Sequence, residues 1–405
     1  MVPGAESGSD GARWRPMAAR RVVRLRVRRR PVARAAAGCL VLLAGLGAAA
    51  PAAWSASRGT SAAAGCAGWT VAQPLNPGSD NRLRGVAVLS STNAWAVGSY
   101  DPLNGDPTSH LIEHWDGTKW TAVGFAGGVL TGVAAISRTN VWVVGYSFFR
   151  GYHALIEHWD GTGWKVVAVP RHSGILYGVA AVSAADIWAV GELGALHWNG
   201  TAWKRVPTPA PGGVLLAVAA SSPTHVWAVG YRGGTPSKTL VLRWNGTSWK
   251  HLASPNPAGT AAANLNVLDG VTAINRHNVW AVGYDASVTN GPRNTLIEHW
   301  NGRRWKHVPS PNPGDSNGTL GNILAGVAAS SASNVWAVGQ YESAGSGVLT
   351  LTARWNGTAW KQVPSPNPSV AGFTANYLYA VAAASPDNVW AVGVAVTRAL
   401  ALHRC

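Results

Sequence analysis

The unit that recurs along this chain reads Asn278-Val279-Trp280-Ala281-Val282-Gly283 and then, after a loop, Leu296-Ile297-Glu298-His299-Trp300-Asn301-Gly302-Arg303-Arg304-Trp305. Its first half occurs seven times, and its second half, which ends in two tryptophans five residues apart, occurs six times. The first-half tryptophans are Trp95, Trp142, Trp188, Trp227, Trp280, Trp336 and Trp390. Self-similarity at a period of about 40 to 55 residues indicates a propeller or a solenoid.

Each repeat holds four short segments, named A to D in chain order, that are rich in β-branched and aromatic residues and bounded by Gly, Pro, Asn or Ser. This composition predicts strands rather than helices. Segment A is of the Gly-Val-Ala-Ala type, B is Val-Trp-Ala-Val-Gly, C is Leu-Ile-Glu-His-Trp and D is Trp-Lys-x-Val-Pro. An Asp-Gly or Asn-Gly pair stands between C and D in all six complete copies, which predicts a tight hairpin with a type I′ turn and two residues at positive φ.

One four-stranded unit cannot bury both of its faces, so the repeats are expected to stack radially and protect their edges. We therefore predict an all-β fold, a seven-bladed β-propeller of four-stranded antiparallel blades. The repeated tryptophans are interpreted as packing between blades, each burying on the order of 200 Å². An aromatic platform for a ligand is the alternative interpretation.

Loop lengths divide the predicted propeller into two rims. The interval from the start of A to the Trp of B is ten residues in every repeat, whereas the interval between the B and C tryptophans varies from ten to twenty. In an antiparallel blade the A-to-B and C-to-D turns lie at one end and the B-to-C and D-to-A loops at the other. We call these ends the constant rim and the elaborated rim.

Residues 1–64 differ from the repeats and are interpreted as a signal segment with a short linker, which leaves 65–405 as the propeller. Eight arginines between Arg20 and Arg34 precede an apolar run that begins at Cys39 and small residues near Pro51, a pattern typical of a cleaved secretory signal. An uncleaved anchor is the alternative, because the apolar segment 35–50 is only slightly shorter than the ~17 to 25 residues that span a bilayer. We expect a secreted, extracellular protein that has no membrane attachment once the leader is removed.

The net charge of +16 comes largely from the leader, which holds 11 of the 33 Lys and Arg residues and 2 of the 17 acidic residues. The remaining 22 basic and 15 acidic residues give +7, a mild basic bias that is compatible with anionic wall polymers. A nucleic-acid-binding domain would gather its Lys and Arg residues on one face, so no nucleic-acid partner is expected.

The order of the motifs resembles the kelch-type repeat, in which an aromatic residue before a glycine pair is followed by a Glu-x-Tyr-Asp element and a Trp. Val141-Trp142-Val143-Val144-Gly145, Glu157-His158-Trp159-Asp160 and Trp164 follow that order, but the second glycine is missing and Trp replaces Tyr. The resemblance implies a divergent kelch-type or galactose-oxidase-like propeller of the secreted bacterial type. Galactose oxidases need copper and a Tyr–Cys crosslink, whereas the mature chain keeps only Cys66 and Cys405, at its two ends. We therefore expect no cofactor.

No metal site is expected either. A histidine precedes the segment C tryptophan in four repeats. Equivalent positions in different blades lie too far apart, however, for these histidines to coordinate one metal ion at the ~2.1 Å of a metal–histidine bond. Three glutamates of segment C are interpreted as hydrogen-bonding residues within their blades, and no separate carboxylate pair indicates glycoside hydrolysis. The histidines and glutamates concerned are His114, His158, His197, His299, Glu113, Glu157 and Glu298.

These observations predict a non-catalytic binding or scaffold propeller, expected to be a monomer, that recognises an extracellular glycan, a cell-wall polymer or a protein. The alternative is an extracellular hydrolase or lyase of the propeller type that acts on polysaccharide, but no catalytic residue can be named for it.

The ligand is expected at the elaborated rim, because loops carry specificity while short turns hold geometry. Long loops are predicted at 99–110, 284–295 and 340–349 and at the Pro-Asn-Pro segments around Asn256, Asn312 and Asn367. A fixed Leu precedes a variable residue at the start of each segment A, and the variable residues should surround the channel mouth. They are Arg84, Thr131, Tyr177, Leu216, Asp269, Ala325 and Tyr379, of which Arg84, Thr131, Tyr177, Asp269 and Tyr379 are the candidate ligand-binding residues.

The last repeat lacks segment D, and the N-terminus supplies a match to it. Trp69-Thr70-Val71, with Pro74 and Asn76-Pro77, matches Trp360 to Pro368, so the N-terminal strand should complete the last blade. This alignment places Cys405 and Cys66 at neighbouring positions of the interrupted C-to-D turn, although Arg404 in place of Trp allows a slip of one residue. We predict a Cys66–Cys405 disulfide in the oxidising extracellular compartment.

Overall fold

The described part of the chain contains twenty-eight strands, which form seven separate four-stranded antiparallel sheets. The computed structural model describes residues 68–104, 108–124, 127–148, 151–210, 212–234, 236–259, 261–287, 292–314, 321–370 and 372–405. These residues belong to one compact unit. The predicted leader, 1–64, lies outside the described residues.

The A strands lie innermost, because together they line a central cavity. They are β2 (Asp80–Ser90), β6 (Val129–Ser137), β10 (Leu176–Ser183), β14 (Gly213–Ser222), β18 (Leu265–Asn275), β22 (Asn322–Ser331) and β26 (Asn376–Ser385). The B strands are β3 (Asn93–Asp101), β7 (Asn140–Ser147), β11 (Asp186–Gly191), β15 (His225–Arg232), β19 (Asn278–Ala286), β23 (Asn334–Ser343) and β27 (Asn388–Ala395).

The C strands follow, and the D strands form the outer edges. The C strands are β4 (Ser109–Trp115), β8 (His153–Trp159), β12 (Gly194–Trp198), β16 (Lys238–Trp244), β20 (Asn294–Trp300), β24 (Gly347–Trp355) and β28 (Arg398–Arg404). The D strands are β5 (Trp120–Gly124), β9 (Trp164–Val166), β13 (Trp203–Val206), β17 (Trp249–Leu252), β21 (Trp305–His307), β25 (Trp360–Gln362) and β1 (Trp69–Val71).

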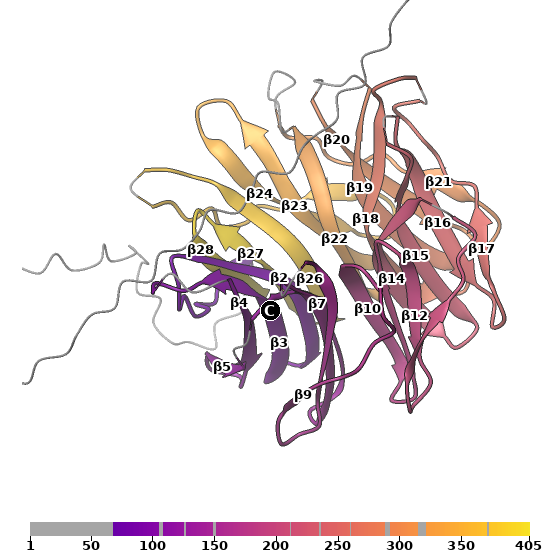
Figure 1. Cartoon of the computed structure of the whole chain (residues 1–405). Coiled ribbons are helices and arrows are strands. Elements are labelled where there is room, and N and C mark those ends of the chain that lie inside the picture. The colour runs from indigo at the N-terminus through magenta and orange to yellow at the C-terminus, as the bar shows by residue number, and fades with distance from the viewer. Residues whose placement is uncertain are drawn as a thin grey trace, which may run out of the picture. The chain divides into compact units, whose positions relative to one another are not determined.

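The sheets are numbered as blades 1 to 7 from β2–β5 onward, and they form a closed ring. Each A strand contacts the A strand of the next blade, and β2 of blade 1 also contacts β26, β27 and β28 of blade 7. In Figure 1 the yellow C-terminal strands accordingly lie beside the indigo N-terminal ones. The predicted seven-bladed propeller is therefore confirmed.

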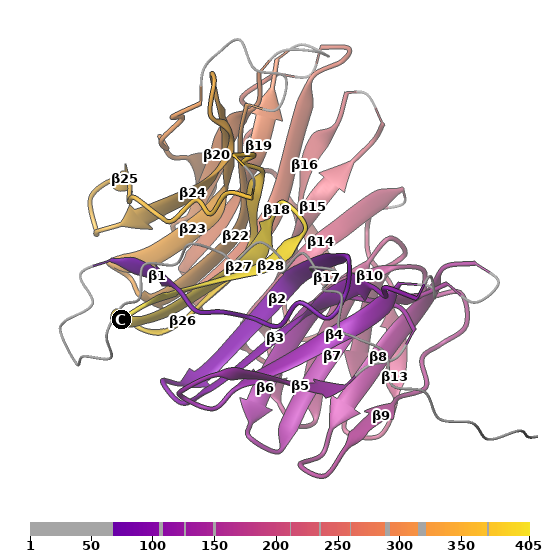
Figure 2. The ribbon, with the colours of Figure 1, turned by 90° about the vertical axis from the view of Figure 1, so that its left-hand side faces the viewer.

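The N-terminal strand closes this ring as predicted. β1 pairs with β28 in the sheet order β1-β28-β27-β26, with Trp69 opposite Arg404. The same register joins Trp198 to Trp203 in blade 3, so the slip that Arg404 allowed does not occur. Figure 2 shows β1 beside the C-terminus.

The tryptophans pack between blades, also as predicted. Trp280 of blade 5 lies 4.9 Å from Trp355 and 5.4 Å from Trp360 of blade 6, measured between ring centroids. The same arrangement joins Trp390 of blade 7 to Trp115 and Trp120 of blade 1, at 5.0 Å in both cases. Edge-to-face and tilted aromatic pairs of this kind stabilise the fold beyond what the burial of their apolar area contributes.

The hairpins at the constant rim are tight, but the predicted type I′ turn is wrong. Only the glycine has positive φ in these turns, for example Gly302 at 92°, and no Asp or Asn before such a glycine does. The Asn301 side chain instead accepts hydrogen bonds from the backbone N–H groups of Arg303 and Arg304, both at 3.1 Å. This Asx-type bonding explains the Asp or Asn at this position without a second left-handed residue.

The elaborated rim is more regular than predicted. β23 and β24 extend as a paired hairpin as far as Ser343 and Gly347, so most of the expected loop 340–349 is strand. The Pro-Asn-Pro segments are also held within their blades, because the Oδ1 atom of Asn312 accepts the backbone N–H of Thr295 at 2.7 Å. Asn256, Asn367 and Asn76 make the corresponding bond to strands β16, β24 and β28.

Candidate functional site

The seven variable residues at the start of the A strands share one backbone feature, a β-bulge. In blade 1 Leu83 pairs with Gly98 and Gly85 pairs with Val97, so Arg84 is the extra residue. The register shifts at the equivalent position in every blade. Bulges re-aim side chains and occur next to binding sites.

The residue after the bulge is Gly or Ala because neighbouring blades approach closely there. A Cβ atom added to Gly326 would lie 3.0 Å from the Cα of Ala380 in the next blade. A Cβ atom added to Gly85 would lie 3.2 Å from the Cα of Gly132. The fixed Leu before the bulge is buried in all seven blades, so its side chain anchors the A strand in the core.

All seven bulge residues line one central cavity of about 210 Å³. The structure therefore brings together Arg84, Thr131, Tyr177, Asp269 and Tyr379, the residues that the sequence predicted as a group. The other two bulge residues, Leu216 and Ala325, add apolar side chains to the wall of the cavity.

Arg84 and Tyr379 form one side of the cavity. The guanidinium carbon of Arg84 lies 5.7 Å from the ring centroid of Tyr379, a cation–π contact. Burial raises the pKa of the Tyr379 hydroxyl, and Arg84 and Arg82 partly oppose that shift. The Nε atom of Arg84 is buried without a hydrogen-bond partner among the described residues, so this donor is available to a ligand.

Asp269 supplies the acidic group of the cavity. Burial raises the pKa of its carboxyl to about 7, although the positive charge of Arg293 acts in the opposite direction. Arg293 lies 5.1 Å from the ring centroid of Tyr284, whose pKa is raised by burial and by Asp269. Around neutral pH this carboxyl can therefore donate or accept a hydrogen bond.

Two of the predicted residues are engaged with the protein. The Thr131 hydroxyl lies 2.8 Å from the carbonyl oxygen of Leu176 and 3.2 Å from that of Val144, so its donor holds neighbouring blades together. The Tyr177 hydroxyl lies 3.5 Å from Oε1 of Glu192, and burial is the first cause that raises its pKa to about 12. Thr131 can still accept a hydrogen bond, but it is mainly structural.

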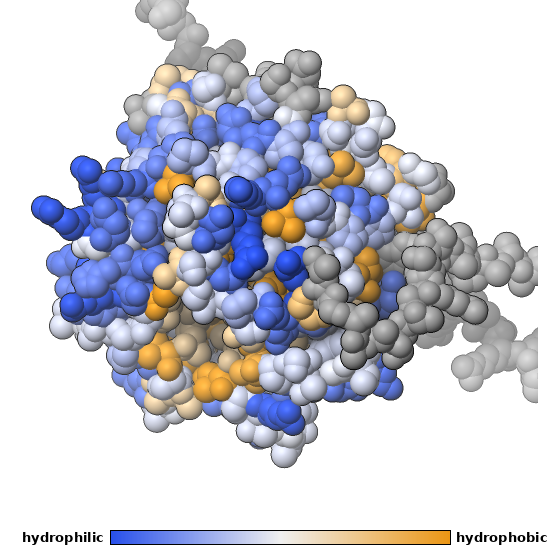
Figure 3. All heavy atoms as spheres, turned by 180° about the vertical axis from the view of Figure 1, so that it is seen from behind, coloured by the Kyte–Doolittle hydropathy of each residue, from blue (hydrophilic) through white to orange (hydrophobic). Residues whose placement is uncertain are grey.

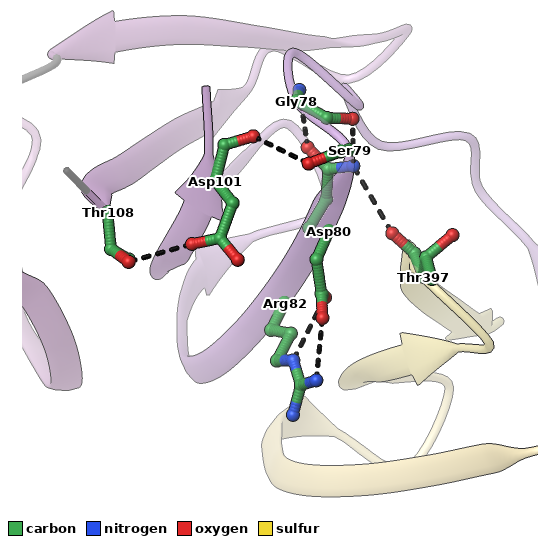
Figure 4. A network of polar contacts seen from close by, with 8 residues as sticks. Gly78, Ser79, Asp80, Arg82, Asp101, Thr108 and Thr397 are labelled. Atoms are coloured by element: carbon green, nitrogen blue, oxygen red, sulfur yellow. Dashed lines mark hydrogen bonds and ion pairs between the residues drawn. The ribbon is translucent and has the colours of Figure 1, made fainter. Parts of the chain in front are cut away.

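A second cavity, of about 230 Å³, shares Arg84 and opens at the elaborated rim between blades 1 and 2. The Arg82 guanidinium donates two hydrogen bonds to the Asp80 carboxylate, at 2.9 and 2.6 Å. The Thr108 hydroxyl donates to Asp101 at 2.7 Å. Figure 4 shows these groups, with Thr397 of the β27–β28 turn bonded to the start of β2.

An aromatic cluster borders this second cavity. Tyr146 and Phe148 belong to its lining. Their rings and that of Tyr152 make three mutual edge-to-face contacts at 5.4 to 5.9 Å between centroids. Tyr152 is 63% exposed and Phe148 40%, whereas most large apolar side chains are buried. The face in Figure 3 is mainly hydrophilic, with scattered apolar residues and one larger apolar area around a hollow in the lower part of the view.

The histidines before the strand C tryptophans are structural. His299 stacks on Trp280 of its own blade at 4.2 Å between centroids, and its Nε2 atom lies 2.9 Å from Oδ1 of Asn278. Within the described residues, no three His, Cys, Asp or Glu side chains are placed to hold a metal ion. No helix in the part of the chain that is described is long and apolar enough to span a membrane.

The three strand C glutamates differ from one another. Glu113 accepts the backbone N–H of Leu75 at 3.2 Å, so it is a hydrogen-bonding residue as predicted, but its partner lies in the segment that joins β1 of blade 7 to β2 and not in a strand of its own blade. Glu157 lies 3.5 Å from His110, and burial lowers the pKa of that histidine to about 4 while raising that of Glu157 to about 7. The prediction is wrong for Glu298, because neither carboxyl oxygen has a hydrogen-bond partner among the described residues.

The predicted disulfide stays a prediction. Cys66 lies outside the described residues, and Cys405 is the only cysteine within them. The pairing of Trp69 with Arg404 nevertheless brings the segments next to both cysteines together.

Sequence reasoning missed the second cavity and its aromatic border. Asp80, Arg82 and Tyr152 occupy positions that do not repeat from blade to blade. Their departure from the repeat was the available signal, and it became informative only once the strands on either side were placed.

No protein-family model matches the chain, and no curated protein matches it. Solved structures similar to it include U3-55K, with 13% identity and a TM-score of 0.56, covering 84% of this chain and 99% of that one. The WD40 propeller domain of Doa1 has 11% identity and a TM-score of 0.57, with coverages of 83% and 97%. A GH74 xyloglucanase from Xanthomonas campestris has 14% identity and a TM-score of 0.55, with coverages of 82% and 53%.

At these identities the similarity shows the fold alone. The chain is a seven-bladed β-propeller of four-stranded antiparallel blades, closed by its N-terminal strand. Its structural neighbours include WD40 propellers and a polysaccharide-active propeller, so the kelch type is not shown and stays a resemblance.

Proposed function

We propose that this protein is a secreted, non-catalytic propeller that binds an extracellular glycan at the centre of its elaborated rim. The observation that carries the proposal is the exposed aromatic cluster Tyr146–Phe148–Tyr152 beside a cavity lined by Asp80, Arg82, Arg84 and Asp101. A sugar presents an apolar C–H face and a polar hydroxyl edge. The two halves of this site match those two surfaces.

The polar half is held in place before any ligand arrives. Arg82 is fixed by its two bonds to Asp80, and that hydrogen bonding is the main cause that raises the pKa of the guanidinium above its usual range. Preorganised groups lose little conformational entropy on binding. Arg84 lines both cavities, so a saccharide longer than one ring can extend from the rim toward Asp269 on the axis.

A glycan array tests the proposal. The purified protein should retain a defined set of oligosaccharides, and Tyr152→Ala should weaken binding at least tenfold, or about 1.4 kcal/mol. Val166→Ala is a matched control, because Val166 is 73% exposed and lies on β9 away from both cavities. Equal losses in the two variants, or a pull-down that recovers only a protein partner from an array-negative sample, would overturn the proposal.

A hydrolase or lyase acting on polysaccharide is the second candidate, and one observation favours it. The Asp269 carboxyl, with its pKa raised to about 7, faces the central cavity near Tyr284 and Arg293, as a general acid could. Reducing-end release from the polysaccharides that bind, lost in Asp269→Asn while binding persists, would support the enzyme. Retention of every bound saccharide intact favours the binding protein.

A further inference from the structure

The turns of the constant rim are so alike that blade 5 stands apart from the other blades. At the third position of the C-to-D turn Thr occurs in five blades, as Thr118, Thr162, Thr201, Thr247 and Thr358, whereas blade 5 has Arg303. Arg304 follows it, and the A-to-B turn of the same blade carries Arg276 and His277. The repeat thus serves as an internal reference, against which blade 5 has four basic residues in two adjacent turns.

The two turns are in contact, so their side chains share one surface. The indole Nε1 of Trp300 donates to the carbonyl oxygen of Arg276 at 3.2 Å. A Cβ atom added to Gly302 would lie 2.7 Å from Nδ1 of His277. Arg276, His277, Arg303 and Arg304 are all exposed, while the backbone beneath them is fixed by Asn275 and Asn301.

These basic groups have no acidic partner within the part of the chain that the structure describes. None of the four forms an ion pair among the described residues. The Nε atom of Arg276 instead donates to Nε2 of His277 at 2.6 Å, which requires a neutral imidazole. The carboxylates near the constant rim, Asp116, Asp160, Asp186 and Asp387, belong to blades 1, 2, 3 and 7.

Blade 4 adds two more basic groups on the adjoining side. Arg243 lies over the Trp227 ring at 5.5 Å, and its Nε atom is buried without a hydrogen-bond partner among the described residues. In blade 6 the equivalent Arg354 donates to Asn334 at 2.7 Å, but His225 replaces that acceptor in blade 4. Burial, followed by the positive charges of Arg243 and Arg276, lowers the pKa of His225, so the groups of the two blades are close enough to interact.

We propose that this cluster on the constant rim of blades 4 and 5 binds the phosphate or sulfate ester groups of an anionic glycan. Guanidinium groups recognise tetrahedral oxyanions through two parallel N–H···O bonds. A bound ester would accept from Arg276, Arg303 and Arg304, and it would remove the mutual repulsion of the cluster. Screening limits the interactions of exposed charges to a range of about 8 Å at physiological salt. The other basic residues, which are scattered over the protein, therefore cannot replace this local cluster.

The chain itself supplies the test variant. Arg303→Thr/Arg304→Ala reproduces the Thr358-Ala359 turn of blade 6, so folding should be retained, and the new Thr hydroxyl can bond to Asn301 as Thr358 does to Asn356 at 2.8 Å. Lys204→Ala/Lys361→Ala removes the same charge from exposed D-strand positions and is the matched control. The probes are dextran sulfate, a phosphorylated dextran and uncharged dextran at several salt concentrations.

We expect the wild type to bind one or both charged dextrans at least tenfold more tightly than uncharged dextran. The Arg303→Thr/Arg304→Ala variant should lose at least tenfold in that affinity and the lysine variant less than twofold. The affinity for charged dextran should depend less steeply on salt concentration in the arginine variant, and its salt dependence should be unchanged in the lysine variant. A preference for one charged dextran identifies the ester. Equal losses in both variants, no preference for charged dextran, or equally tight binding of a DNA duplex at the same salt would overturn the proposal.

Discussion

The indole ring of Trp69 meets that of Trp336 edge to face, with 5.2 Å between the centroids. The other complete blades place a D-strand tryptophan in this position, as Trp360 does against Trp280. The guanidinium of Arg404 lies 5.2 Å from the Trp336 ring, where a C-strand tryptophan packs elsewhere. The first and last described segments together thus rebuild one inter-blade contact.

Removing the Trp69 side chain should open the ring at its closure. Because this indole is only 7% exposed, Trp69→Ala should lower the free energy of unfolding by about 3 to 5 kcal/mol. Denaturant titration measures the change. Thr70→Ala, at the exposed neighbouring position of β1, is the control and should cost less than about 1.5 kcal/mol. A Trp69 variant as stable as this control would contradict closure by β1.

The terminal cysteines should be joined in the exported protein. Closing a loop of some 340 residues stabilises a fold by about 5 to 6 kcal/mol on the chain-entropy model, and strain reduces that figure. Non-reducing peptide mapping should recover Cys66 and Cys405 in one peptide, and Cys66→Ser/Cys405→Ser should melt at a lower temperature. Free thiols at both positions would show that the predicted disulfide does not form.

The repeat explains how far the sequence alone could go. Strand types, blade number, ring closure and the bulge residues that share the central cavity all follow from patterns that occur six or seven times. The turn type was mispredicted because an Asx side-chain bond, as at Asn301, also favours Asn-Gly.

Close packing of the A strands should make their glycines intolerant of branching. Gly326→Val would push against the Ala380 backbone, and overpacking of this kind costs about 1 to 3 kcal/mol although Val favours strands. Gly163→Ala is the control, because Gly163 has open space around it and the equivalent residues are Ala202 and Ala359. Thermal melts compare the two. A Gly326→Val variant that melts no lower than Gly163→Ala would argue against close contact between blades.

The buried carboxyl of Glu298 should make stability depend on pH. Burial raises its pKa well above the ordinary value, so the folded state holds this proton more tightly than the unfolded chain does. Its contribution to stability is complete below about pH 4.3, the unfolded value, and is lost as pH rises toward the folded pKa.

Glu298→Leu should therefore stabilise the fold at pH 8 by about 1 to 3 kcal/mol, and by less at pH 5. Leucine fits because Leu196, Leu242 and Leu402 occupy the equivalent position in other blades. Glu113→Leu should gain less, since it breaks the bond from Leu75. Chemical denaturation at both pH values measures the difference, and an equal gain at pH 5 and pH 8 would rule out the titration of Glu298 as its cause.

The candidate site was less predictable than the fold for a physical reason. Repeated residues report blade packing, whereas a ligand site on a propeller axis is built from residues that differ between blades. Arg84 could be found because the repeat marks its position. Asp80, Arg82 and Tyr152 could not, because their proximity depends on how blades 1, 2 and 7 meet.

Calorimetric titration of the tightest saccharide from the array into Arg84→Ala tests the central claim most directly. Ala325 occupies the same bulge position in blade 6, so alanine is compatible with the backbone there, and the variant removes only the side chain that links the two cavities. We predict that Kd rises at least tenfold in this variant and stays within twofold of the wild type in Lys204→Ala/Lys361→Ala. An unchanged Kd in Arg84→Ala would contradict glycan binding at the centre of the elaborated rim.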